Sequence, residues 1–329
     1  MLKEKVLKTI KKYNLIEQND RIVCGVSGGP DSICMLDILR RVKTEKQINF
    51  DIIVCHINHL IREEATADEQ YVENYCKKYQ IPFFVKRIDV KKIAEDNKQG
   101  TEETGRKVRY EFFEEIFQKE KANKIAIAHN KNDKIETIIM NVFRGSGISG
   151  LRGIEPIRDN KFVRPVIECE RKEIERYCEE YKLEPRIDKT NFINDVTRNK
   201  IRNIVIPYIK DEFNPNIINT LDRLSNVITE EDEYMKKQTL NIYNKIRIRE
   251  DVGYTIIDLK QFNIQEEIIR KRIIMYAITK TVGTSQNIEK VNIEDIIKLC
   301  ANNIGNKYLT PNKNIKISVG KGQVIFEKL

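Results

Sequence analysis

The segment that decides the fold reads Ile22-Val23-Cys24-Gly25-Val26-Ser27-Gly28-Gly29-Pro30-Asp31-Ser32. Its first five residues form a short apolar run of the kind found in a buried strand. The glycines that follow let the backbone adopt conformations closed to other residues and approach a ligand closely. A helical pattern begins directly after them, so unpaired N–H groups and the positive end of a helix dipole face this turn. We therefore expect a phosphate-binding turn between a strand and a helix.

The side chains of the turn favour the same interpretation. Ser27 and Ser32 add hydroxyl donors, and Asp31 is suited to hold a magnesium ion that bridges phosphate oxygens. The turn is not a Walker A loop, because the lysine of the G-x-x-x-x-G-K-[ST] pattern is missing. The alternative is an ordinary turn before a helix capped by serine and aspartate, and six matched positions at the first strand–helix junction argue against it. The candidate nucleotide-binding residues here are Ser27, Gly28, Gly29, Pro30, Asp31 and Ser32.

Strand-like and helix-like patterns alternate between about residue 20 and residue 170. This alternation predicts an α/β fold with a doubly wound, mostly parallel sheet that is covered on both faces. In such sheets ligands bind outside the carboxyl ends of the strands, where the polar motifs of this chain cluster. The expected strands are Arg21–Val26, Phe50–Cys55, Phe83–Ile88, Lys124–Ala128 and Phe162–Ile167.

The pattern changes after Asn214-Pro215-Asn216, which interrupts the chain. Apolar residues then recur at helical spacing and lead into a long charged segment, which predicts one long helix. Two further helical patterns, at 266–279 and 292–301, precede a hairpin with strands at 314–319 and 323–327. We expect three parts: a main domain over residues 1–213, a long helical connector over 214–249, and a small α+β module over 250–329.

Composition narrows the class of protein. No apolar stretch among the 329 residues approaches the roughly 18–20 that a membrane-spanning helix requires, and the N-terminus lacks the apolar core of a signal peptide. We therefore expect a cytoplasmic protein. The net charge of +9 favours a polyanionic partner such as nucleic acid, although a lysine-rich genome explains it equally well. Seven cysteines without a C-x-x-C pair argue against a disulfide framework or a zinc ribbon.

Three further groups of residues accompany the turn. They are His56-Ile-Asn58-His59 with Ile61-Arg62, then Glu103-Thr-Gly-Arg106-Lys-Val-Arg109-Tyr110, then Ala128-His129-Asn-Lys-Asn-Asp133-Lys-Ile-Glu136-Thr137 leading to the Gly-rich segment 144–153. The turn resembles the S-G-G-x-D-S loop of the N-type PP-loop ATP pyrophosphatases, which have a Rossmann-like fold. Together with these groups and with Arg198-Asn-Lys-Ile-Arg202, the chain resembles the tRNA(Ile)-lysidine synthetase family over roughly residues 20–210.

That resemblance implies a carbon–nitrogen ligase that uses ATP and magnesium. The C2 carbonyl oxygen of the wobble cytidine, in tRNA(Ile) with a CAU anticodon, attacks the α-phosphate of ATP, and the ε-amine of free lysine then displaces AMP to form lysidine. Asp31 would hold magnesium, and the loop would bind the phosphates. His56 and His129 would complete the nucleotide site. The catalytic residues would be Asp31, Asp133, Glu136 and Arg202, and the tRNA-binding residues Arg62, Arg106, Arg109, Arg144, Arg152 and Arg198.

Each of these roles has a plainer alternative. Asp133 and Glu136 suit the ammonium of lysine and the acceptance of its proton, but their spacing is also that of a capping box. Positive charge at the transition state fits Arg202 or Arg198, and the sequence leaves that choice open. Arg106 and Arg109 have the alternative of a solvated helix face, and segment 144–153 that of a plain surface loop, although its alternating Gly and Arg favour RNA contact. A metal cluster at the first histidine pair is disfavoured, because no cysteine or third histidine stands at ligand spacing.

Two other functions compete. A PP-loop tRNA thiolase would need a reactive cysteine pair or an iron–sulfur site, which the cysteine spacing disfavours. A non-catalytic RNA-binding module would have little reason to keep Asp31, Asp133 and Glu136. We expect the C-terminal module to contact tRNA as a second binding element, and we expect this chain to be too short for the further C-terminal domain that some family members carry. The oligomeric state is open, with a homodimer among the alternatives.

Overall fold

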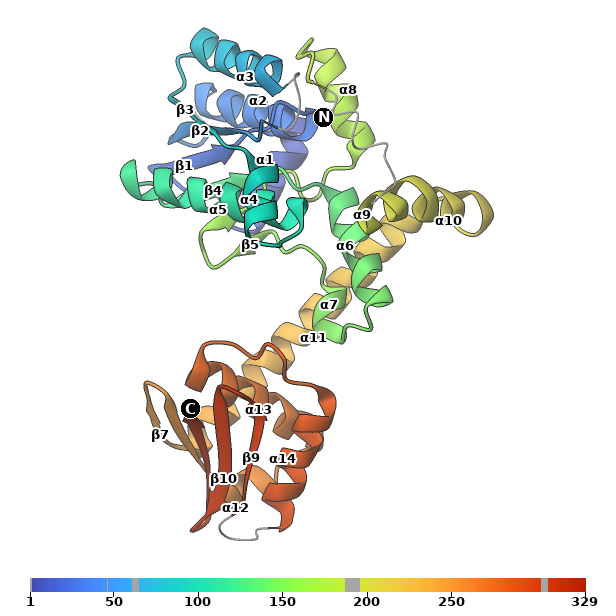
Figure 1. Cartoon of the computed structure of the whole chain (residues 1–329). Coiled ribbons are helices and arrows are strands. Elements are labelled where there is room, and N and C mark those ends of the chain that lie inside the picture. Colours follow the sequence, from blue (N-terminus) through green and yellow to red (C-terminus); the bar gives the residue numbers. More distant parts are fainter. Residues whose placement is uncertain (1, 46, 61–64, 187–195, 303–306) are drawn as a thin grey trace. The chain divides into compact units, whose positions relative to one another are not determined.

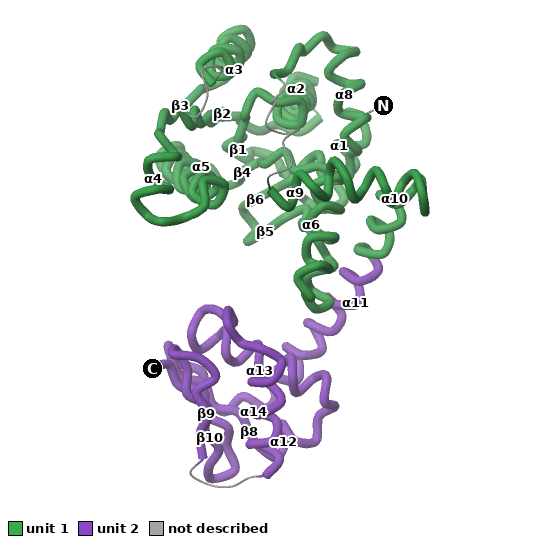
Figure 2. Tube along the Cα trace, turned by 45° about the vertical axis from the view of Figure 1, so that its right-hand side comes forward, with its two compact units in different colours: residues 1–226 green, residues 227–329 purple. Residues whose placement is uncertain are grey.

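The computed structural model describes residues 2–45, 47–60, 65–186, 196–302 and 307–329 (Figure 1). The chain divides into two compact units, residues 1–226 and 227–329 (Figure 2). The boundary falls within the long helix α11 (Ile217–Ile246), which occupies most of the expected connector. Within the described ranges, no helix combines the length and apolarity that a bilayer span requires.

Unit 1 contains a six-stranded sheet of order β3-β2-β1-β4-β6-β5, in which every neighbouring pair is parallel except β5 with β6. This confirms the predicted doubly wound, mostly parallel sheet. The last expected strand is shorter than predicted, because the ladder stops before Pro165, which has no N–H to donate. The strands are β1 (Asp20–Gly25), β2 (Phe50–Asn58), β3 (Phe83–Arg87), β4 (Lys124–Ile127), β5 (Ile157–Arg158) and β6 (Phe162–Val163).

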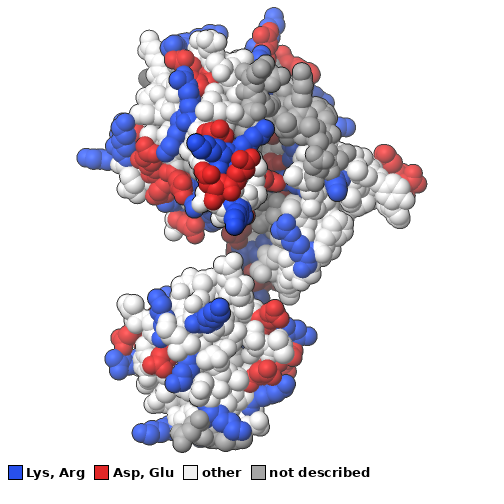
Figure 3. All heavy atoms as spheres, in the orientation of Figure 1, with Lys and Arg blue, Asp and Glu red and all other residues white. Residues whose placement is uncertain are grey.

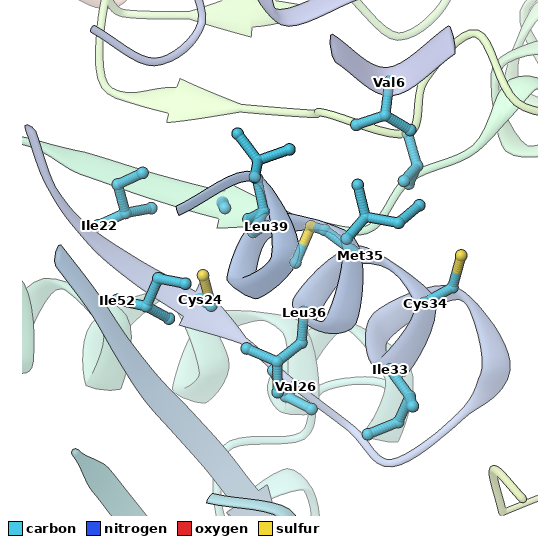
Figure 4. Packing of buried hydrophobic residues seen from close by; sticks show 14 of the residues in the cluster. Val6, Ile22, Cys24, Val26, Ile33, Cys34, Met35, Leu36, Leu39 and Ile52 are labelled. Carbon is cyan, nitrogen blue, oxygen red and sulfur yellow. The ribbon is translucent and has the colours of Figure 1, made fainter. Parts of the chain in front are cut away.

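Helices cover both faces of this sheet. Apolar side chains of α2 pack between β1 and β2 on one side and Val6 of α1 on the other, as Figure 4 shows. The opposite face is covered by α5, whose Phe112, Phe113 and Ile116 pack on strand residues such as Val23 and Ile125. The helices of these layers are α1 (Leu2–Lys12), α2 (Pro30–Thr44), α3 (Ala65–Tyr79), α4 (Val90–Asp96), α5 (Thr101–Lys119) and α8 (Arg171–Glu180).

A second helical group in unit 1 surrounds α6. Ile135, Ile138 and Ile139 of α6 are buried against apolar residues of the segment 201–218, as their helical spacing predicted. The next turn of the same pattern is not buried, since Val142 and Phe143 are exposed. The elements of this group are α6 (Lys131–Phe143), α7 (Ile148–Leu151), α9 (Thr197–Lys200), the π-helical segment η2 (Ile201–Val205), α10 (Ile206–Glu212) and the start of α11.

Unit 2 is an antiparallel sheet of order β7-β8-β11-β10-β9 with α12 (Leu259–Asn263), α13 (Glu267–Val282) and α14 (Lys290–Asn302) packed on it. The predicted hairpin is confirmed as β10 and β11, joined by Lys321 and Gly322. Both residues have positive φ, 51° and 74°, as a two-residue type I′ turn requires. The strands are β7 (Arg247–Asp251), β8 (Tyr254–Asp258), β9 (Lys307–Asn312), β10 (Ile315–Gly320) and β11 (Gln323–Lys328).

Candidate active site

The turn after β1 is built by its own backbone and two serines. Gly28 has a φ of +92°, a conformation that residues other than glycine disfavour. The Gly28 carbonyl accepts a hydrogen bond from the Arg186 amide at 3.0 Å. Ser32 Oγ donates to the Gly29 carbonyl at 3.0 Å and accepts from the Ser27 amide at 3.2 Å. α2 starts at Pro30 with Gly29 as N-cap and without a capping side chain. The alternative of a serine- and aspartate-capped helix is therefore wrong.

His56 lies behind this turn. Its ring is buried, and its Nδ1 makes a 2.8 Å hydrogen bond to the carbonyl of Val26, the residue before Ser27. Burial lowers the pKa of His56, so the ring is neutral. The contact fixes the backbone of Val26, directly before Ser27, so in this structure His56 supports the turn from behind.

Asp31 contacts the N-terminus of α6, the helix that follows the neighbouring strand β4. Its Oδ1 accepts a hydrogen bond from Asn130 Nδ2 at 2.8 Å. Burial, and next the negative charge of Asp133, raise the pKa of Asp31 to about 6. A divalent cation would stabilise the ionised form of Asp31, so the residues present fit magnesium at this carboxylate.

Asp133 and Glu136 form a second cluster with two arginines. Arg202 donates to Glu136 Oε1 at 2.6 Å and Oε2 at 2.7 Å, and to Asp133 Oδ1 at 3.0 Å. Arg198 donates to Glu136 Oε2 at 2.9 Å and to Asp133 Oδ1 at 3.3 Å. Glu136 is 1% exposed, so these are partly desolvated, charge-assisted contacts.

Asp133 does form a capping box, but with Asn130 and not with Glu136. Asn130 Oδ1 accepts from the Asp133 amide at 3.0 Å, and Asp133 Oδ2 accepts from the Asn130 amide at 3.0 Å. Oδ1 of Asp133 remains directed at the arginines. The structural and the functional interpretations of Asp133 are therefore compatible, since one oxygen caps α6 and the other faces the site.

His129 lies at the carboxyl end of β4 among arginines. Its Nδ1 accepts a hydrogen bond from Arg164 Nε at 3.1 Å. Burial, followed by the nearby charges of Arg164 and Arg198, keeps the pKa of His129 well below its usual range. A neutral histidine beneath several guanidinium groups makes this part of the site electropositive and suited to an anion.

The residues expected to bind tRNA fall in different places. Arg106, Arg109 and Arg144 are exposed, the first two on α5 and the third just after α6. Arg152 is 8% exposed and pairs with Glu155, so it holds its own loop and presents little surface. Arg198 belongs to the carboxylate cluster, and Arg62 lies outside the described residues.

The segment that contains Arg152 closes against α6 through Gly153. This glycine has a φ of +65°, and a Cβ there would lie 2.8 Å from Ile138 Cγ1 and 3.1 Å from the Lys134 carbonyl. Both the backbone conformation and the close approach to α6 therefore require glycine. Gly153 thus allows the Gly-rich segment to pack against α6, the helix that carries Asp133 and Glu136.

Sequence reasoning missed three polar residues of this site: Asn130, Asn132 and Arg171. Asn130 links α6 to Asp31, and Asn132 Oδ1 accepts from the Arg171 amide at 3.0 Å. Arg171 Nη2 lies 3.8 Å from Asp31 Oδ2 and 4.0 Å from Asp133 Oδ1. For Arg171, the available signal was the mostly charged segment 168–172, a few residues after β6.

The chain is similar to several known proteins. The PP-loop domain family matches residues 2–209. A tRNA(Ile)-lysidine synthase of Clostridioides difficile (strain 630) is 44% identical over 326 residues, which cover 99% of this chain and 70% of that protein. One from Clostridium acetobutylicum is 46% identical over 308 residues, which cover 93% of this chain and 66% of that protein. The chain thus spans about two thirds of the length of these relatives.

A solved structure is similar in fold. The U34-tRNA thiolase NcsA from Methanococcus maripaludis, with its [4Fe-4S] cluster, superposes with a TM-score of 0.58 over 70% of this chain and 78% of that chain. At 20% identity this likeness concerns the fold alone. The sequence relatives are far more similar, and they confirm the family that the motifs predicted. The chain belongs to the tRNA(Ile)-lysidine synthase family and carries a PP-loop domain.

Proposed function

We propose that this chain ligates free lysine to C2 of the wobble cytidine of tRNA(Ile) with a CAU anticodon, releasing AMP and pyrophosphate. One observation carries the proposal. The nucleotide-binding turn and the Asp133–Glu136 pair lie at the carboxyl ends of adjacent strands, β1 and β4, and the 2.8 Å contact between Asn130 and Asp31 joins them. A site for an activated phosphate thus adjoins a site for a cationic amine.

The first half-reaction uses the turn. Amides at the start of α2 and the hydroxyls of Ser27 and Ser32 bind the β- and γ-phosphates of ATP. Magnesium, held by Asp31, supplies positive charge to the phosphate oxygens when bound. The cytidine carbonyl oxygen forms a bond to the α-phosphorus, and pyrophosphate leaves. His129 and Arg164 line the electropositive side of the site, where negative charge develops.

The second half-reaction uses the carboxylates. The ε-ammonium of lysine replaces one arginine contact on Asp133 or Glu136, and one of these carboxylates accepts its proton. The neutral amine then forms a bond to C2 of the cytidine, and AMP departs with the former carbonyl oxygen. The arginine that is released, Arg198 or Arg202, remains next to the phosphate. Because the carboxylates are buried, the exchange of one cation for another avoids an unpaired charge.

The tRNA is held by parts of both units. Exposed Arg106, Arg109 and Arg144 are suited to phosphate contacts in unit 1, and we assign a second contact to unit 2. We place the reaction in the cytoplasm, where ATP, lysine and tRNA occur together.

A tRNA thiolase is the second candidate, since the similar fold of NcsA belongs to one. All seven cysteines of this chain are buried. No group of three or more potential metal ligands from His, Cys, Asp and Glu occurs in the part of the chain that the structure describes. Sulfur transfer needs an accessible thiolate or a cluster, so these observations favour the lysine acceptor.

The decisive assay combines the protein with ATP, magnesium, radiolabelled lysine and a tRNA(Ile) transcript bearing CAU. We expect label to enter the tRNA only when ATP is present. A transcript with uridine at the wobble position is the matched control and should stay unlabelled. Pyrophosphate release without incorporation of lysine would point to another acceptor and overturn the proposal.

A further inference from the structure

The N-termini of three helices meet at Asp31. Asn130, the N-cap of α6, donates to Asp31 at the start of α2. α8 begins at Arg171, whose amide donates to Asn132 of α6, and the Lys131 amide donates to the Cys169 carbonyl at 2.8 Å. These bonds hold the backbone of Arg171 at the ATP site. The positive ends of these helix dipoles would favour phosphate groups bound beside Asp31.

The side chain of Arg171 is held far less firmly than its backbone. Its Nη2 lies 3.8 Å from Asp31 and 4.0 Å from Asp133, and both distances exceed that of a hydrogen bond. By contrast, Arg202 makes contacts of 2.6 to 3.0 Å with Glu136 and Asp133. Arg171 is 28% exposed. Its guanidinium therefore neutralises two carboxylates at long range and is available to a closer partner.

We propose that Arg171 is a phosphate-binding residue of the ATP site, which leaves the Asp31–Asp133 pair and contacts the triphosphate when the nucleotide binds. This inference rests on the proposed use of ATP at Asp31. Asp31 would hold magnesium in the loaded site, and that positive charge would replace the one that Arg171 now supplies. The guanidinium of Arg171 would then be free to pair with phosphate oxygens. The planar guanidinium matches phosphate geometry through paired N–H donors.

The test measures binding by three variants of the whole chain: Arg171→Ala, Arg171→Lys and Lys172→Ala. Lys172 is the next residue of α8 and is exposed, so its substitution removes one positive charge from the neighbouring position. Calorimetry would give the Kd for ATP with magnesium and without tRNA, and filter binding the Kd for tRNA without ATP. Thermal denaturation would verify that each variant is folded.

We expect Arg171→Ala to raise the Kd for ATP by about tenfold or more, which is the loss of one charged hydrogen-bonding partner. Arg171→Lys should recover part of that loss, and Lys172→Ala should stay within about twofold of the unchanged chain. The Kd for tRNA should be unchanged in all three variants. A merely structural role of Arg171 would disturb both ligands together.

Besides a loss of both ligands, two results would overturn the inference. One is an unchanged Kd for ATP in a folded Arg171→Ala variant. The other is a loss confined to tRNA, which would make the RNA backbone the source of the phosphate. If the unchanged chain itself failed to bind ATP, the proposed function would fail, and that outcome is distinguishable because it does not depend on the variants.

Discussion

At the scale of single residues, Asp31 is a charge that the ligand-free site tolerates poorly. Its pKa is raised from 3.8 to about 6, so between these values the folded chain binds more protons than the unfolded chain. The stability due to protonated Asp31 is thus fully present below about pH 4 and is lost as the pH rises through 6.

We therefore expect Asp31→Asn to raise the free energy of unfolding at pH 7 by about 1–3 kcal/mol without magnesium, while it abolishes pyrophosphate release. Urea denaturation at pH 7 and at pH 4 would test this, because the gain over the unchanged chain should vanish at pH 4. Equal gains at both pH values would contradict the origin in ionisation.

Glu136 is the residue on which the lysine site most depends. It accepts hydrogen bonds from both Arg198 and Arg202 and is 1% exposed. Glu136→Gln removes the negative charge but keeps the shape, so we expect lysine incorporation to fall by more than about tenfold. The Kd for ATP should stay within about twofold. Glu175→Gln, at an exposed position on α8, is the control and should change neither quantity. A parallel loss of ATP binding would place Glu136 in the nucleotide site.

The two partners of Glu136 also mark the limit of sequence reasoning at this scale. The spacing of Asp133 and Glu136 at a strand end predicted that these carboxylates share a site with the turn. The residues that bind them, Arg198 and Arg202, lie 62 to 69 positions further along. No local pattern reports a contact over that separation. The burial of Arg152 likewise depends on how segment 144–153 closes on α6.

At the scale of elements, Asp37 ties three helices together. It is fully buried in α2 and accepts hydrogen bonds from Tyr75 of α3 at 2.8 Å and Tyr177 of α8 at 2.7 Å. Its own helix adds Arg40 at 2.7 Å and Arg41 at 2.6 Å. Burial opposes its ionisation, but these four donors keep the pKa of Asp37 below its usual range. The cluster fixes the position of α8, which begins at Arg171, relative to the turn.

Asp37→Ala should lower the free energy of unfolding by about 3–5 kcal/mol, because it leaves buried donors without their acceptor. Since the pKa of Asp37 is lowered on folding, this difference is largest above the unfolded pKa and shrinks as the pH falls through the folded value. Chemical denaturation across pH would measure it. Asp51→Ala, which removes an exposed partner of Lys43, should cost less than about 1 kcal/mol. Similar losses in both variants would argue against the cluster.

The elements themselves were predictable where they are buried. The strands of unit 1 are short apolar runs, and the hairpin of unit 2 alternates Ile315, Ile317 and Val319 into its core. β7 and β9 escaped prediction, and many of their residues are exposed. β8 also escaped prediction, although Thr255 and Ile257 alternate into the core. The π-helical η2 arises next to Pro207, which has no N–H for a helical bond, and the Ile206 amide donates five residues back to the Ile201 carbonyl. That local irregularity contains Arg202.

At the scale of the whole molecule, the chain carries 59 basic and 50 acidic side chains. Figure 3 shows Lys and Arg interleaved with Asp and Glu on the face in view, in both units. The net charge of the chain is nevertheless +9. We expect this excess of positive charge to attract a polyanion, and exposed arginines such as Arg106 and Arg109 to add phosphate contacts.

This distribution predicts how tRNA binding responds to salt. Each phosphate contact releases counterions, so we expect the Kd for tRNA to rise by at least about tenfold between 50 and 200 mM salt. Arg106→Gln and Arg109→Gln should each lower the slope of log K against log salt by about one, if each residue neutralises one phosphate. Fluorescence anisotropy with labelled tRNA would give these slopes, and Lys172→Ala provides a charge-matched control away from the proposed RNA contacts. A flat response in the unchanged chain would mean that base contacts, and not phosphates, dominate the affinity.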